Sequence, residues 1–277
     1  MRGVAEKNYK GYPDPSRIVS VDEASTLVKD KNVVFVDTRN YWKYAKGHIP
    51  GAVNLELYAF HWFDTSNEGL KIFAGEMARL FGAYGIDEKK QVVFYQNDSG
   101  YEAARGVWLL EFLGNGRGRM LDGGLRAWKR RGLGLWKTDP EIVRARFASK
   151  PNLGVVCGLD ELAESLGRGS LRIVDARASG EYDGTYRRAL KAGHVPGAVN
   201  IEWKRAMRRD GTLKSAKQLA PLYGGLPVRG QVVTYCQSGY RAAHSWLVLR
   251  LLGYGNARNY LGSWYEWGNG ADTPVEK

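Results

Sequence analysis

The sequence predicts two α/β domains in tandem, each with a mainly parallel sheet flanked by helices on both faces. Two phrases repeat in the same order at nearly equal spacing: residues 47–54 return as 193–200, and 99–101 return as 238–240. In both halves, short apolar runs alternate with helical patterns, which favours parallel strands joined by helices. The runs are continuously apolar, as expected of strands that helices cover on both faces.

In the first half, Ser20 and Glu23 form a capping-box pattern that opens a helix ending near residue 30. A buried strand follows at 33–36 and ends at Asp37. The remaining elements expected here are a short strand after the turn at 47–54, a helix at 69–84, a strand at 91–95, a helix at 101–113, a strand at 119–121 and a helix at 125–131.

The second half repeats this order. We expect a helix at 160–166, a strand at 171–174 that leads to Asp175, a helix at 216–223, a strand at 231–235 and a helix at 240–252. The connection is expected at 137–152, between Pro140 and Pro151. We therefore place the domain boundary near residue 145, which gives an inactive domain at 1–145 and a catalytic domain at 146–277.

Composition indicates an ordinary globular protein. Hydrophobic residues make up 44% and charged residues 25% of the 277 positions, which is typical of such proteins. No apolar run approaches the roughly 18 residues that span a bilayer, and the polar start has no apolar core of the kind a secretory signal needs. We expect a cytoplasmic protein that does not bind membranes.

The formal net charge is +12, with the larger excess in the second half. A positive field concentrates small anions and speeds their arrival. The basic residues are spread along the chain rather than clustered, so we expect an anionic small molecule as substrate and no nucleic acid.

The chain has two cysteines, in different contexts. Two cysteines do not make a disulfide framework, and the four histidines show no metal-ligand spacing, so we expect neither a metal nor a cofactor. Cys157 is expected to be a small, semi-buried apolar residue. Cys236 instead stands between a buried strand and a helix, where the first copy has Gln96, Asn97 and Asp98. One copy thus has a nucleophile that the other lacks.

The loop at 236–241 suits a reactive thiol. A helix N-terminus leaves backbone N–H groups unpaired and carries about half a positive charge. A tight loop on that end forms a nest for an anion, in which a cysteine should ionise more readily than a free thiol. The same donors would hold an anionic persulfide. Gly239 suits a position with positive φ.

Several motifs resemble those of one family. They are Asp37-Thr38-Arg39 and Asp175-Ala176-Arg177 after the early strands, Gly-His-Ile/Val-Pro-Gly-Ala in both copies, the six-residue loop from Cys236, and Leu121-Asp122-Gly123-Gly124. Across almost its whole length the chain resembles the tandem rhodanese-domain sulfurtransferases, which have an inactive first domain and a catalytic cysteine in the second. Its ending, residues 259–269, looks like the bacterial and archaeal thiosulfate sulfurtransferases.

The resemblance implies a double-displacement reaction in which Cys236 takes sulfur from a small anionic donor and passes it to a thiophilic acceptor. It implies binding of the substrate and persulfide by the loop residues Gln237, Ser238, Gly239, Tyr240 and Arg241. We add Arg187 and Arg188, in the insertion before Gly193, as further substrate-binding residues, and Asp175 and Arg177 as supporting residues.

Departures from the family pattern leave alternatives. Vertebrate-type thiosulfate enzymes have basic residues where this chain has Ser238 and Glu181. Mercaptopyruvate enzymes favour Cys-Gly-Ser-Gly-Val-Thr, which only Ser238 and Gly239 match. Thiosulfate is therefore preferred over 3-mercaptopyruvate, and a persulfide carrier with a protein acceptor is the alternative of a different class. A phosphatase is disfavoured, because Cys236 and Arg241 are one residue too close for its longer loop.

Other residues are given structural roles. We expect His48 and His194, which recur in both copies, to fix loops, and His244, Trp264 and Trp267 to pack. Asp37 and Asp175 should pair with Arg39 and Arg177. Tyr41 and Trp42 are candidates for a wall of the site, and Asp98 is a candidate occupant of the first copy's vacated anion nest.

Overall fold

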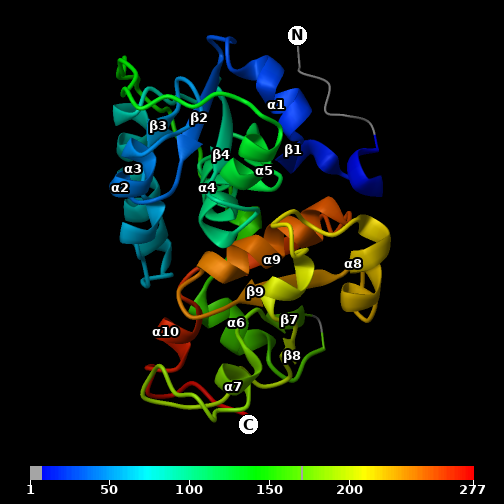
Figure 1. Ribbon diagram of the computed structural model, residues 1–277. Helices are drawn as coiled ribbons and strands as arrows, with labels where there is room; N and C mark the ends of the chain where they lie inside the picture. The colour runs from blue at the N-terminus through cyan, green and yellow to red at the C-terminus, as the bar shows by residue number, and fades with distance from the viewer. Residues whose placement is uncertain (1–7, 170) are drawn as a thin grey trace.

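The computed structural model describes residues 8–169 and 171–277, which form two α/β halves, each with a five-stranded sheet (Figure 1). The elements of the first half are β1 (Ile18–Val19), α1 (Val21–Leu27), β2 (Val33–Asp37), α2 (Tyr41–Ala45), β3 (Val53–Asn54), α3 (Asn67–Ala83), β4 (Gln91–Tyr95), α4 (Tyr101–Phe112), β5 (Gly118–Leu121) and α5 (Gly124–Arg130). Those of the second half are β6 (Val156–Cys157), α6 (Leu159–Ser165), β7 (Leu171–Asp175), α7 (Ser179–Tyr182), β8 (Val199–Asn200), α8 (Ala216–Tyr223), β9 (Gln231–Tyr235), α9 (Tyr240–Leu251), β10 (Ala257–Tyr260) and α10 (Ser263–Trp267).

The two sheets have the same topology. Their strand orders are β1-β5-β4-β2-β3 and β6-β10-β9-β7-β8, and every pairing is parallel. The predicted fold of two repeated, parallel α/β units is therefore confirmed. In the second sheet Asp175 is in register with Tyr235, so the carboxyl ends of β7 and β9 lie together. Ligands bind beyond such ends in open α/β sheets.

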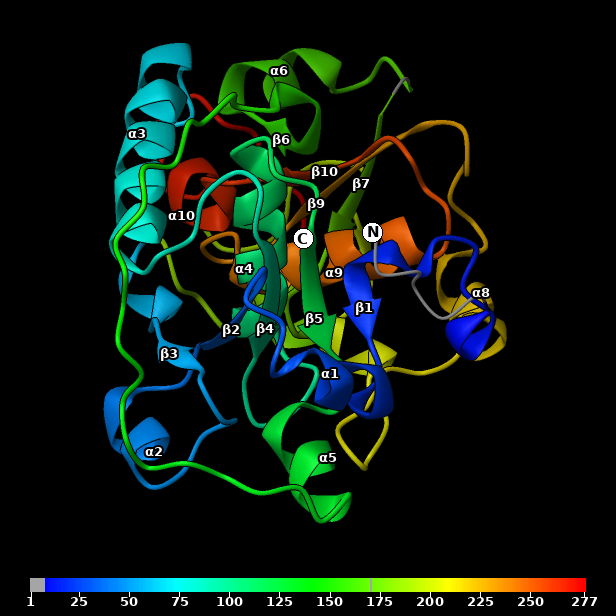
Figure 2. The same cartoon turned by 90° about the horizontal axis from the view of Figure 1, so that it is seen from above.

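The two halves meet through equivalent helices. Helix α4 packs against α9, and side chains of both belong to one hydrophobic core that includes Trp108 and Trp246. Both views show α9 lying across the side of the first half (Figures 1 and 2). Almost every residue of α9 is buried, because one side covers its own sheet and the other covers α4. The loops that precede these two helices are therefore brought to the same interface.

Polar contacts also cross the interface. The buried Asp122 carboxylate accepts hydrogen bonds from Ser99 at 2.7 Å and from the Leu213 N–H at 2.8 Å. Glu266 of the second half accepts from the Thr65 hydroxyl at 2.8 and 2.9 Å. Ser99 belongs to the same half as Asp122, but the Leu213 N–H and the Thr65 hydroxyl each donate to an acceptor of the other half. These two contacts help fix how the halves sit against each other.

Candidate active site

The cysteine loop, residues 236–241, joins β9 to α9. Gly239 has a left-handed conformation, with φ of 79°. A Cβ atom at this position would lie 2.8 Å from the Leu261 carbonyl oxygen, so glycine is required both by the backbone and by the space. The Asn259 side chain donates to the Gly239 carbonyl at 3.1 Å and ties the turn to β10.

Cys236 lies in this loop with only 1% of its surface exposed. Its backbone N–H donates to the Ser263 hydroxyl at 3.1 Å, and its carbonyl accepts the Trp264 N–H at 2.9 Å. Both partners come from α10. Its apolar neighbours are Ala176, Ala242 and Trp203. The backbone of Cys236 is therefore anchored to α10, and its side chain is buried.

Six consecutive backbone N–H groups, those of residues 237–242, have no acceptor within the part of the chain that the structure describes. The next one, of Ala243, donates to the Gly239 carbonyl at 3.1 Å and starts the helical ladder of α9. Unpaired donors at the end of a helix favour a bound anion. The loop therefore offers a nest of donors beside the thiol.

The matching loop of the first half is filled by its own side chain. Gln96 stands where the second half has Cys236, and its Oε1 accepts the Glu102 N–H at 2.9 Å. Asp98, our candidate occupant, instead accepts a hydrogen bond from Gln96 Nε2 at 3.1 Å. Burial raises the pKa of Asp98. The Gln96 amide oxygen therefore takes the Glu102 N–H of the first copy's loop, and the Asp98 carboxylate lies beside that amide.

Arg241 is bound to the carboxylate of Glu181, one of the two residues that depart from the vertebrate-type pattern. Its Nη1 and Nη2 donate to the two Glu181 oxygens at 2.6 and 2.9 Å. Burial alone would lower the pKa of Arg241, but the hydrogen bonds of Glu181 and the charges of Cys236 and Glu181 raise it. Burial raises and Arg241 lowers the pKa of Glu181, with a net decrease. The pair keeps both groups charged.

The first half has charges of the opposite sign at the two equivalent positions. Glu102 occupies the position of Arg241 after the repeated Ser-Gly-Tyr, and Lys43 occupies that of Glu181. Burial raises the pKa of Glu102 to about 7, against the attraction of Lys43. Side chains of both line one small hollow. The end of the first loop thus carries a carboxylate where the second carries a cation.

The two arginines of the insertion differ. Arg188 is near the site, because its Nη1 lies 3.7 Å from Glu181 and its carbonyl accepts from Gln237 Nε2 at 3.2 Å. Arg187 is exposed and has no ion pair among residues 8–169 and 171–277. The Gln237 side chain is buried, and its Oε1 has no partner in the same residues. The hydrogen bond from Gln237 to Arg188 thus connects the cysteine loop to the insertion before Gly193.

Ser238 and Tyr240 take different positions in the loop. Ser238 is half-buried. The Tyr240 ring is buried and turned to the first half, where its hydroxyl lies 2.7 Å from the carbonyl oxygens of Leu57 and Phe60. What Tyr240 can offer a substrate is therefore its backbone N–H.

Asp175 and Arg177 form the expected buried pair, with Nη2 to Oδ2 at 2.6 Å. The guanidinium also donates to the Gly193 carbonyl at 2.7 Å, and the Tyr235 hydroxyl donates to Asp175 at 2.6 Å. Asp37 and Arg39 repeat this arrangement in the first half, with a bond to the carbonyl of Gly47. Both copies have the pair, including the one without a cysteine in its loop, and in both the guanidinium holds the repeated turn against the strand end.

The histidines are placed as expected. His48 and His194 stack on Tyr44 and Tyr182 and bond to the carbonyls of the same tyrosines through Nδ1. They therefore fix the loops. His244 is fully buried and packs at the interface.

Three aromatic residues near the loop were not predicted from the sequence. Trp203 packs beside Cys236, and the Tyr101 ring of the first half meets it edge-on, with 5.2 Å between centroids. The Tyr58 ring lies 5.4 Å from that of Tyr240. The repeated Ser-Gly-Tyr was a usable signal for Tyr101, because the equivalent helices meet. No sequence pattern pointed to Trp203 or Tyr58.

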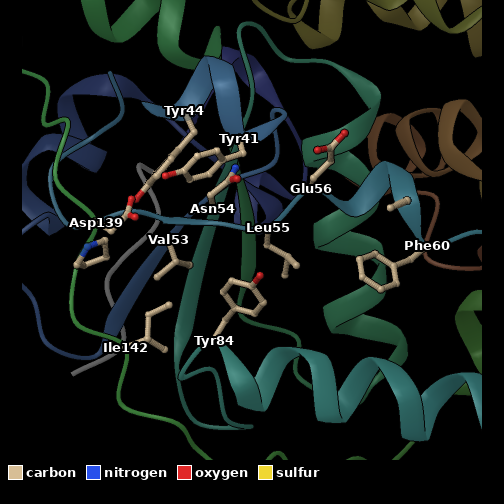
Figure 3. A pocket seen from close by; sticks show the side chains of 12 residues that line it. Tyr41, Tyr44, Val53, Asn54, Leu55, Glu56, Phe60, Tyr84, Asp139 and Ile142 are labelled. Carbon is tan, nitrogen blue, oxygen red and sulfur yellow. The ribbon is translucent and has the colours of Figure 1, made fainter. Parts of the chain in front are cut away.

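Tyr41 and Trp42 do not form the expected wall. Tyr41 lines a separate hollow of about 500 Å³ in the first half, where Figure 3 shows it beside Tyr44 and Asp139. No residue of the cysteine loop lines that hollow. Trp42 is 76% exposed. The aromatic residues near the loop are instead Trp203, Tyr101 and Tyr58.

Comparison with known proteins identifies the family. The family model described as "Rhodanese-like domain" matches residues 20–131 and again residues 158–269. The chain belongs to the rhodanese-like family. Both copies of this rhodanese-like protein are matched, so the first half is a full member of the family and not an unrelated attachment.

Curated relatives match nearly the whole chain. The thiosulfate sulfurtransferase of Pseudomonas aeruginosa is 32% identical, over 96% of this chain and 98% of the relative. That of Azotobacter vinelandii is 35% identical, over 88% and 91%. The sulfur carrier protein TtuD of Thermus thermophilus is 33% identical, over 96% and 99%.

Solved structures confirm the fold. The anaerobic ergothioneine biosynthesis enzyme from Chlorobium limicola superimposes with a TM-score of 0.83 at 23% identity, covering 95% of this chain and 70% of that enzyme. In the rhodanese-like protein no helix of the described residues is long and apolar enough to cross a membrane. Cys157 is buried, and burial raises its pKa, as expected of an inert thiol.

Proposed function

We propose that this protein is a thiosulfate sulfurtransferase in which Cys236 carries the transferred sulfur as a persulfide. Relatives named thiosulfate sulfurtransferase match the chain at 32% and 35% identity over most of its length. The two halves differ in the one loop where the reaction would need a nucleophile. The substrate class is a small sulfur-bearing anion, in keeping with the net charge of +12.

The reaction needs two displacements. The Cys236 thiolate attacks the outer sulfur of thiosulfate, the S–S bond of thiosulfate breaks, and sulfite leaves with the bonding electron pair. Cys236 then carries an anionic persulfide. Cyanide or a thiolate attacks the outer sulfur of the persulfide, and the electron pair returns to the Cys236 sulfur. No external oxidant is consumed, and one difficult transfer becomes two easier ones.

The contrast between the two loops carries this proposal. Residues 237–242 offer six backbone N–H groups without acceptors in the described chain, next to a cysteine. In the first half the Gln96 amide takes one of the corresponding donors. Because preorganised donors stabilise charge without reorganising, the free nest suits the anionic sulfur that persists through both steps. Arg241, oriented by Glu181, stands at the end of the nest.

The test is a measurement of mass after incubation with thiosulfate. We expect the intact protein to gain one sulfur atom on Cys236 and to lose it when cyanide is added. Cys236→Ser should remain folded and gain nothing, whereas the matched control Cys157→Ser should behave as the unchanged protein. Uptake by Cys236→Ser, or none by the unchanged protein, contradicts the proposal. Parallel kinetics with 3-mercaptopyruvate should give the lower kcat/KM.

A second candidate function is supported by one observation. The Thermus thermophilus relative is named a sulfur carrier protein, and it matches the chain from end to end. As a carrier, the protein would form the same persulfide but pass it to a protein thiol. Steady turnover with thiosulfate and cyanide supports the enzyme. Slow turnover, with a persulfide that persists until a protein acceptor is added, supports the carrier.

A further inference from the structure

Arg105 is a buried cation without a hydrogen-bond partner. It lies on α4 of the first half with 0% exposure. None of its three guanidinium nitrogens has a hydrogen-bond partner among the residues that the structure describes. Its guanidinium carbon lies 4.5 Å from the ring centroid of Trp108 and 4.9 Å from that of Tyr240. Cation–π contacts offset part of the cost of burying this charge, but no carboxylate of the described residues is paired with it.

The guanidinium reaches the cysteine loop of the other half. A Cβ atom built on Gly239 would lie 3.3 Å from Arg105 Nη1. Tyr240, which stacks on the same guanidinium, is the next residue of the loop. Arg105 therefore lies directly against the loop that holds Cys236, on the side of the first half.

Comparison of the two repeats shows that the equivalent residue facing the other loop carries no charge at neutral pH. The residue equivalent to Arg105 in α9 is His244, five positions after Gly239 as Arg105 is five after Gly100. His244 Nε2 lies 3.0 Å from the Ser99 carbonyl oxygen in the inactive loop. Burial lowers the pKa of His244 to about 4, so it is neutral at neutral pH. Each half thus reaches into the other's loop, but the charged side chain faces the loop with the nucleophile.

We propose that Arg105 is an electrostatic positioning residue for Cys236, through which the first half balances the negative charge of the thiolate and the persulfide. This inference rests on the proposed function. An unpaired cation is expensive inside a protein, and the anionic sulfur of the reaction is the countercharge that the site itself supplies. Burial lowers the pKa of Arg105 to about 10, and Tyr240 and Cys236 oppose that decrease. Arg105 therefore remains charged at neutral pH.

The test compares Arg105→Met with Arg105→Lys in a Cys157→Ser background. The rate at which neutral iodoacetamide alkylates Cys236 is measured against pH, without any sulfur donor. We expect the profile of Arg105→Met to move to higher pH by about one unit, and kcat/KM for thiosulfate to fall about tenfold. Arg105→Lys keeps the charge and should restore most of both.

Arg119→Met is the matched control. Arg119 is also a buried arginine of the first half, but it pairs with Glu23, with Nη2 to Oε2 at 2.9 Å. Removing it should lower the melting temperature, because Glu23 is left unpaired, without moving the alkylation profile. Arg105→Met should melt at or above the unchanged protein, since replacing an unpaired buried charge by an apolar group is often neutral or stabilising.

The outcomes of these measurements test the role of Arg105 separately from the proposed function. An alkylation profile that Arg105→Met leaves in place, or that Arg119→Met moves equally, overturns the role of Arg105. If the unchanged protein takes no sulfur from thiosulfate, the proposed function fails, while the alkylation comparison still decides whether Arg105 acts on Cys236. Should Arg105→Met not fold, the neutral Arg105→Gln gives the same comparison.

Discussion

The pair of Arg241 and Glu181 shows how a carboxylate can belong to a site for anions. Glu181 accepts two hydrogen bonds from Arg241 and lies 3.7 Å from Arg188. It orients Arg241 at the end of the nest, because a bidentate pair fixes the plane of the guanidinium. It also cancels part of the positive charge that a donor such as thiosulfate would meet.

We therefore predict that Glu181→Gln lowers the KM for thiosulfate severalfold, because it removes a negative charge from the site and keeps an oxygen that accepts from Arg241. kcat should change less. Steady-state kinetics with thiosulfate provide the measurement. Glu161→Gln is the control, since Glu161 on α6 pairs with Arg258 outside the loop and its removal should leave KM unchanged. A KM that rises for Glu181→Gln would show that the orientation of Arg241 by Glu181 matters more than the negative charge of Glu181.

The burial of His244 leads us to predict that the free energy of unfolding falls in mild acid. Its Nδ1 is buried without a partner among the described residues, and burial lowers its pKa from 6.5 to about 4. Between these values the unfolded chain binds a proton that the folded chain excludes. The stabilising contribution is thus complete above pH 6.5 and is lost as the pH falls.

The expected loss at pH 5 is about 2 kcal/mol. It is measured as the free energy of unfolding in urea at pH 7.5 and pH 5, for the unchanged protein and for His244→Gln. The substituted glutamine side chain cannot be protonated, and its amide can still donate to the Ser99 carbonyl. The difference between the two proteins should shrink by that amount at pH 5, because other titrating groups cancel. An equal difference at both pH values would show that His244 does not titrate there.

At the scale of elements, the strand-to-helix turn decides what the loop can do. We predict that Gly239→Ala loses sulfur uptake and about 1–3 kcal/mol of stability, because the left-handed backbone and the contact with the Leu261 carbonyl both oppose a Cβ atom. Gly197→Ala is the matched control, since Gly197 has φ of 74° and open space around it. It should lose only the backbone contribution and keep its activity. Retained uptake by Gly239→Ala would mean that the loop tolerates a different turn.

The long elements were predictable, and so were the short elements α1, α5, α6, β3 and β5, whereas the other short elements were not. The four strands that end at Asp37, Tyr95, Asp175 and Tyr235 and the helices α3, α4, α8 and α9 lie where the apolar patterns place them. Two-residue strands such as β1 and β6 carry no periodicity, so only neighbouring strands define them. β10 and the short helices α2, α7 and α10 were also missed. The last two carry Glu181 and Ser263, which hold the site.

The site was predictable only where the repeat makes a contrast. Cys236 stands out because Gln96 replaces it in the first copy. The pairing of Glu181 with Arg241 joins residues 60 positions apart, and the approach of Arg105 to Gly239 crosses from one half to the other. Neither contact has a local signal, because both depend on how elements pack rather than on how they form.

At the scale of the whole molecule, duplication has produced one site from two domains. The equivalent helices α4 and α9 meet face to face, which brings both loops to the interface. One loop kept free donors and a nucleophile, while the other is filled by Gln96. The first half keeps its turn-fixing pair, Asp37 and Arg39, because the fold still depends on it. On the function proposed above, the first half acts on the site through the side chains that it places against the cysteine loop, such as Arg105.

The net charge of +12 predicts that capture of thiosulfate depends on salt. A positive field speeds the arrival of a small dianion, and salt screens that field, with a Debye length of about 10 Å at 0.1 M. We expect kcat/KM for thiosulfate to fall severalfold as sodium chloride rises from about 0.02 M to about 0.2 M, while kcat stays nearly constant. Alkylation of Cys236 by neutral iodoacetamide is the control, because an uncharged reagent gains nothing from the field. If salt slows both reactions equally, it acts on the loop itself, and the molecule's overall charge has no part in bringing the donor to the site.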